Sequence, residues 1–117
     1  MTTVTVGNKG EEWACKYLQK LGYKILDRNY RIRGGEIDII AQENRELVFI
    51  EVKTRYSHEF GLPIESITPW KLKALLKTAQ FYLQKINWED KPYRLDVLLI
   101  DFSGNCPSIE LLRNITA

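Results

Sequence analysis

Two apolar runs, residues 36–42 and 46–54, follow each other across a tight turn, and both carry charged side chains among their apolar ones. Their alternation predicts the two antiparallel strands of a hairpin. The turn sets a register in which Asp38 lies directly opposite Glu51, and a slip of one residue would mix apolar and charged side chains on both faces. Charged groups are costly inside apolar strands unless they are paired or bind a metal. The hairpin therefore constrains both the fold and the chemistry of this chain.

The same register places Glu36 opposite Lys53 on the charged face and leaves Ile37 and Ile39 together on the apolar face. Two facing carboxylates destabilise a sheet, and a hard divalent cation would relieve their repulsion. Mg²⁺ prefers carboxylate oxygens, keeps several waters and accepts phosphate oxygens. A lysine beside it can assist an attacking water or stabilise charge on a phosphate. This is the layout of a phosphodiesterase site that uses Mg²⁺ or Mn²⁺.

Glu11 is a further acid that could reach this site. Apolar residues at helical spacing predict a helix over 8–21 that packs on the sheet, and Glu11 stands one turn before Ala14 on the apolar stripe. A second interpretation is that Glu11 only complements the positive N-terminal end of the helix. In the same way, Glu51 and Lys53 could form an ordinary ion pair on a surface strand.

The rest of the chain predicts an α/β fold of order αβββαββ, with a central mixed sheet flanked by helices. Thr68 is a typical N-cap, and Pro69 suits the first helical position. A loop is expected from Tyr56 to Ile67. The predicted elements are a helix over 8–21, strands over 23–31, 36–42 and 46–54, a helix over 68–86, and strands over 94–102 and 108–112. At 117 residues, the chain fits one domain, 1–117.

Composition and sequence patterns argue against several other classes of protein. Seventeen basic and fifteen acidic residues give a net charge of +2, so global charge does not identify a partner. The chain has no apolar run long enough for a membrane span and no signal pattern at its start. Its two cysteines lack metal-ligand spacing, which favours a reduced, cytoplasmic protein. His58 is the only histidine, which argues against zinc catalysis and histidine triads.

Several cations flank the proposed site in the sequence and could contact a nucleic acid. Arg31, Arg33 and Arg55 can grip phosphates, and Lys71 lies in the first turn of the second helix. Lys73 is better explained as part of a solvated helix face.

Other side chains have simpler explanations. Lys77 belongs to the same solvated face as its neighbouring lysine. The three tryptophans are assigned to the core or to an interface. Arg94 and Asp96 are expected to have a structural role near the site.

An ordered set of motifs resembles the YraN-like family of bacterial proteins. The motifs are Gly10-Glu11, Gly22-Tyr23, Asn29-Tyr30-Arg31, Gly35-Glu36-Ile37-Asp38, Phe49-Ile50-Glu51-Val52-Lys53-Thr54-Arg55, Lys71 and Arg94-Leu95-Asp96-Val97. They cover nearly the whole chain. That family is similar to archaeal Holliday-junction resolvases and to the restriction-endonuclease-like nucleases with a PD-(D/E)xK motif.

The resemblance implies a restriction-endonuclease-like core and hydrolysis of DNA phosphodiesters. Glu11 matches the helix acid of that superfamily, Asp38 matches the first strand acid, and Glu51 with Lys53 matches the E-x-K pair. Asp38, Glu51 and Glu11 are then the implied ligands of Mg²⁺ or Mn²⁺. Ile37 stands where the motif has a proline.

The leading hypothesis is thus a metal-dependent endonuclease acting on branched or junction DNA. Analogy with junction resolvases adds a possible homodimer, which would supply two sites to a symmetric junction. One alternative is a non-catalytic nucleic-acid-binding module with a nuclease-like fold. Another is a protein-interaction component whose partner supplies the activity.

Overall fold

A computed structural model describes residues 6–56 and 67–116 of the chain, with side chains from residue 10 onward. The predicted element order and the α/β class are both confirmed. Most of the predicted loop over 56–67, including His58, lies outside the described residues. The elements are α1 (Val6–Lys20), β1 (Lys24–Ile32), β2 (Gly35–Glu43), β3 (Glu46–Arg55), α2 (Pro69–Lys85), β4 (Tyr93–Asp101) and β5 (Ser108–Leu112).

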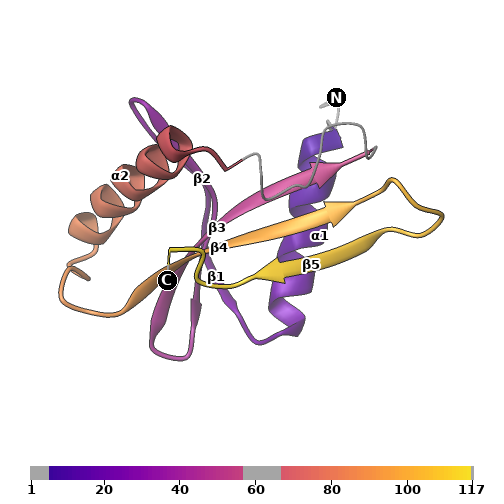
Figure 1. The fold of residues 1–117 in the computed structure, drawn as a ribbon. Helices are drawn as coiled ribbons and strands as arrows, with labels where there is room; N and C mark the ends of the chain where they lie inside the picture. The colour runs from indigo at the N-terminus through magenta and orange to yellow at the C-terminus, as the bar shows by residue number, and fades with distance from the viewer. Residues whose placement is uncertain (1–5, 57–66, 117) are drawn as a thin grey trace, which may run out of the picture.

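The five strands form one mixed sheet in the order β1-β2-β3-β4-β5. Antiparallel pairing joins β1 to β2, β2 to β3 and β4 to β5, whereas β3 and β4 run parallel. Parallel neighbours need a long crossover, and α2 lies within the connection between them. In Figure 1, α2 lies at the left of the view, and α1 lies farther right, where it overlaps β3, β4 and β5.

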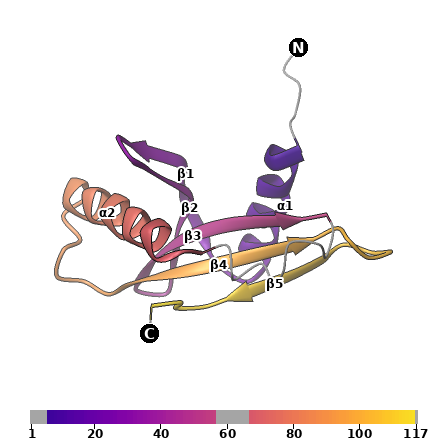
Figure 2. The same ribbon diagram turned by 45° about the horizontal axis from the view of Figure 1, so that its top comes forward.

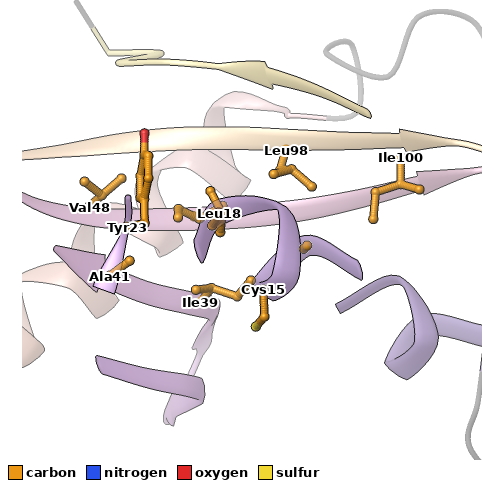
Figure 3. Packing of buried hydrophobic residues seen from close by; sticks show 10 residues of the cluster. Cys15, Leu18, Tyr23, Ile39, Ala41, Val48, Leu98 and Ile100 are labelled. Carbon is orange, nitrogen blue, oxygen red and sulfur yellow. The ribbon is translucent and has the colours of Figure 1, made fainter. Parts of the chain in front are cut away.

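Each helix covers its own apolar face of the sheet. Val48 and Ile50 pack with α1, while Leu47 and Phe49 alternate with them and pack with α2. Figure 3 shows Leu18 of α1 among the strand side chains of the first cluster. Because both faces are covered, β3 and β4 each contain a continuous buried apolar run, 47–50 and 97–100.

Local signals set the ends of the helices. The Thr68 side chain accepts a hydrogen bond from the Lys71 N–H at 3.2 Å, so the predicted N-cap is confirmed. After α1, Gly22 adopts a φ of +96° that favours glycine, and the Tyr23 N–H returns to the Leu18 carbonyl at 3.0 Å. None of the helices in the described ranges is long and apolar enough to cross a membrane.

The predicted hairpin register is confirmed only near the turn. The β2–β3 ladder runs from the Glu43–Glu46 pair to the Ile39–Ile50 pair, and it ends before the expected pairing of Asp38 with Glu51. The further pairing expected for Glu36 is therefore also wrong.

The start of β2 leaves the plane of the sheet. It stays paired to β1 beyond the last β2–β3 pair, and in Figure 2 this hairpin rises from the plane of β3, β4 and β5 toward α2. Ile37 consequently packs in the α2-side cluster and Ile39 in the α1-side cluster. The predicted common face of these two isoleucines is wrong, because the strand twists to pack against α2.

Candidate functional site

Two carboxyl groups meet at the point where β2 and β3 separate. Asp38 of β2 accepts a hydrogen bond from the Val52 N–H at 2.8 Å, and its carboxyl group is within hydrogen-bonding contact of Glu51 on β3. Burial, and then the nearby Asp38 charge, raise the pKa of Glu51 to about 7. Burial also raises the pKa of Asp38, against the effect of the Val52 N–H. Two carboxyl groups in such contact favour sharing a proton or binding a cation.

Two lysines face this pair from different elements. The Nζ atoms of Lys53 on β3 and Lys71 on α2 lie 3.9 Å and 3.7 Å from Glu51 Oε1. The capped start of α2 fixes the position of Lys71. Burial and the neighbouring Lys71 lower the pKa of Lys53. The site therefore holds an amine that releases its proton more readily than an exposed lysine does.

Glu11 approaches the pair from α1. Its side chain is largely buried, and its Oε1 atom has no hydrogen-bond partner among the described residues. Burial, followed by the charge of Asp38, raises the pKa of Glu11, so the two carboxyl groups are close enough to interact. Because α1 starts at Val6 and has no acid in its first turn, the alternative role at the helix terminus is not supported.

A cavity of about 270 Å³ opens beside these groups. It lies between the start of β2, the second half of β3 and the first turns of α2. Its lining residues are Glu36, Asp38, Glu51, Lys71, Ala74 and Leu75. Within 6–56 and 67–116, no three His, Cys, Asp or Glu side chains are grouped closely enough to hold a metal ion by themselves. The groups of this cavity that could hold a metal ion are thus the carboxyl groups of Asp38 and Glu51, with Glu11 near them.

Comparison with known proteins agrees with the motifs. The model of the uncharacterised protein family UPF0102 matches residues 10–100, which include every acid and lysine of the site. The chain belongs to the UPF0102 family. This is the YraN-like family that the motifs resemble.

Relatives of this UPF0102 protein match over most of their length. A UPF0102 protein of Geobacter metallireducens is 46% identical over 110 residues, covering 94% of this chain and 90% of the relative. One from Dehalococcoides mccartyi is 44% identical over 108 residues, covering 92% and 89%. One from Chlorobium limicola is 49% identical over 96 residues, covering 82% and 74%. The family description states no activity.

The predicted phosphate-binding residues are dispersed around the UPF0102 site. Lys71 lines the cavity. Arg31 is exposed and pairs with Glu36 at 3.3 Å, and Arg33 is exposed at the end of the β1–β2 hairpin. Arg55 is half-buried at the end of β3, where its register partner is Asp101. The structure therefore brings one of the four predicted cations into the cavity.

Arg28 of β1 was missed by the sequence analysis. It pairs with Glu12 at 2.8 Å and lies 3.8 Å from Glu11, so it links α1 to β1 behind the site. A register irregularity between Ile25 and Asp27 precedes it, and such a bulge changes the face to which later side chains point. Nothing in the local alternation signals that change.

Arg94 and Asp96 form a separate buried cluster. Arg94 donates to Asp96 at 3.0 Å and to Glu43 and Glu46 at 2.7 Å each. These glutamates flank the turn of the β2–β3 hairpin, whereas Asp38 lies where its strands separate. The expected structural role is thus supported, and the cluster reaches from the hairpin turn to Asp96, whose register partner Ile50 precedes Glu51 in β3.

Proposed function

We propose that this UPF0102 protein is a metal-dependent endonuclease that hydrolyses phosphodiesters of branched or junction DNA, with a restriction-endonuclease-like core. The observation that carries the proposal is the half-buried Asp38–Glu51 pair, faced by Lys53 and Lys71 beside an open cavity. The PD-(D/E)xK motif order supports the assignment. A homodimer would supply the second site that a symmetric junction needs.

The donor set suits a hard divalent cation such as Mg²⁺ or Mn²⁺. It consists of carboxylate oxygens, and Glu11 Oε1 is buried without a hydrogen-bond partner in the described part of the chain. Mg²⁺ is commonly held by one or two carboxylates, with waters and substrate phosphates completing its shell. Asp38 and Glu51 would hold the ion, with Glu11 as a further ligand.

The residues around the carboxylate pair would then have separate roles in the reaction. A Mg²⁺ ion held by these carboxylates would make water easier to deprotonate and would offset charge on the phosphate. Lys53, whose pKa is lowered, orients the attacking water and can hold its proton at Nζ. Lys71 neutralises a phosphate oxygen from the start of α2. The Val52 N–H keeps the Asp38 carboxylate in place.

The test is cleavage of a four-way junction, a flap and a linear duplex with Mg²⁺, with Mn²⁺ and with EDTA. We expect metal-dependent cleavage that falls by at least about 100-fold in both Asp38→Asn and Lys53→Ala, the scale of an acid–base or electrostatic group. Lys20→Ala, at the exposed end of α1, is the matched control and should cleave normally. Cleavage that survives both site substitutions would refute the proposal.

A second candidate is a non-catalytic nucleic-acid-binding module. The absence of a three-ligand metal group within the described ranges favours it, as do the exposed arginines of the β1–β2 hairpin. It predicts salt-sensitive DNA binding that Lys53→Ala leaves unchanged, with no cleavage in either metal. Mn²⁺ soaked into crystals of the protein separates the candidates further, because the endonuclease requires anomalous density between Asp38 and Glu51.

A further inference from the structure

The outer surface of α2 carries two large apolar side chains that are exposed to solvent. Trp70 is 75% exposed and Phe81 is 50% exposed. Trp70, Ala74, Lys77 and Phe81 follow each other at steps of four, three and four residues, which places them on one line along the helix. Trp70 thus belongs to the surface and not to the core.

The charge around this line is positive. Helix α2 contains four lysines and no acid. Lys71 pairs with Glu51, and Lys85 lies over the Tyr30 ring. Lys73 and Lys77 are exposed and form no ion pair with any residue that the structure describes. Exposed aromatics among free lysines complement a nucleic acid, which offers both base faces and phosphates.

The line is continuous with the candidate site. Ala74, which follows Trp70 by one helical turn, lines the cavity together with Lys71. The eleven residue steps from Trp70 to Phe81 rise about 16 Å along the helix axis. At a rise of about 3.4 Å per stacked nucleotide, this length accommodates about five nucleotides. A strand lying along α2 would therefore lead directly to Asp38 and Glu51.

We propose that α2 binds an unpaired DNA strand, with Trp70 and Phe81 stacking on its bases and Lys77 contacting its backbone. Bases inside a duplex are already stacked on each other, so these rings select a single-stranded arm. The substrate class of the proposed endonuclease is then DNA with an unpaired arm next to the cleaved bond. This assignment of the substrate class depends on the proposed endonuclease function, whereas the proposed binding of an unpaired strand does not.

The test is binding without cleavage, in EDTA, by fluorescence anisotropy of three labelled DNAs. These are a single strand, the matching duplex, and that duplex with a single-stranded flap. We expect Trp70→Ala to weaken single-strand and flap binding by between about 5-fold and about 150-fold, the loss of one stacked base. Trp70→Phe should retain most of the affinity, and duplex binding should change by less than about twofold. Gln84→Ala, on the same exposed side of α2, is the matched control.

Lys77→Ala should reduce the slope of log Kd against log salt by about 0.7 for the single strand, the value for one backbone contact. Unchanged single-strand binding in Trp70→Ala would overturn the inference. An equal loss of duplex and single-strand affinity in Trp70→Ala would also overturn it. So would a Trp70→Ala protein that differs from the wild type only in self-association, as measured by sedimentation. If the wild type binds through Trp70 but never cleaves, only the endonuclease proposal fails. If Asp38→Asn abolishes cleavage while Trp70→Ala binds normally, only this inference fails.

Discussion

At the scale of single residues, the Asp38 carboxylate accepts a hydrogen bond from a β3 backbone N–H that a neighbouring strand's carbonyl would otherwise accept. This donor is the Val52 N–H, which lies beyond the last paired residues of β2 and β3. This bond satisfies a backbone donor that would otherwise lack a partner where the strands part. It also holds the carboxylate against Glu51. This hydrogen bond also explains why the charged Asp38 side chain is tolerated between β2 and β3.

The raised pKa of Glu51 predicts a pH-dependent stability. An ordinary value of 4.5 becomes about 7 in the folded protein. Below about pH 4.5 the group is protonated in both states and adds no penalty, whereas above about pH 7 the folded state bears the full cost of the buried charge. The thermal midpoint of the metal-free protein should therefore fall as the pH rises from about 5 to about 8.

Glu51→Gln should flatten this dependence, as measured by thermal denaturation across that pH range. The exposed Glu110→Gln on β5 is the control and should keep the wild-type slope. Adding Mg²⁺ should restore stability at the high-pH end, because the ion binds the ionised carboxylates. A wild-type slope in Glu51→Gln would assign the pH dependence to another group.

At the scale of elements, the β1–β2 hairpin depends on close contact with α2. A Cβ atom added to Gly35 would collide with Thr78 Oγ1 and would lie 3.1 Å from the Ala74 carbonyl oxygen. Glycine is needed here for lack of space, since the hairpin must reach the helix to enclose the cavity. This contact holds the start of β2 out of the sheet plane and so positions Asp38.

Gly35→Ala should therefore destabilise the protein by about 1–3 kcal/mol, the usual cost of overpacking. The measurement is urea denaturation, with Gly104→Ala as control, because a Cβ there meets only an atom at 3.8 Å among the described residues. Adding Thr78→Ala to Gly35→Ala should recover part of the loss by removing the colliding oxygen. A Gly35→Ala protein as stable as the control would show that hairpin and helix can separate without cost.

At the scale of the whole molecule, one buried guanidinium connects parts that are distant in the sequence. Arg94 of β4 bonds to Glu43 and Glu46 around the hairpin turn and to the Tyr23 hydroxyl after α1. Its partner Asp96, fully buried, also accepts the Asn114 N–H after β5 at 2.8 Å. The cluster thus ties both ends of the described fold to the centre of the sheet.

Arg94→Ala should cost about 3–5 kcal/mol, because it leaves buried carboxylates without a counter-charge. Arg31→Ala breaks an exposed pair instead and should cost at most about 1 kcal/mol. Chemical denaturation of both variants gives the comparison. Equal stability of the two would mean that the remaining polar partners satisfy Asp96 and Glu43 without the arginine.

Several features of this protein could be predicted from the sequence because they depend on neighbours within a few residues. Helical spacing located both helices, and Thr68 with Pro69 located the start of α2. The hairpin register near its turn followed from alternation and turn length. The acids and lysine of the candidate site were selected by residue type and order, which the chain carries without reference to its fold.

What only the tertiary structure decided is how those residues face one another. Period-two alternation assumes an even strand, but β2 pairs with β3 only from Ile39 onward, because its start packs on α2. Ile37 and the expected Asp38 pairing were therefore assigned wrongly. Two further features were not predicted from local spacing. They are the bulge that turns Arg28 toward α1 and the outward position of Trp70. Twist, strand separation and exposure result from contacts between segments far apart in the chain, and local spacing carries no information about them.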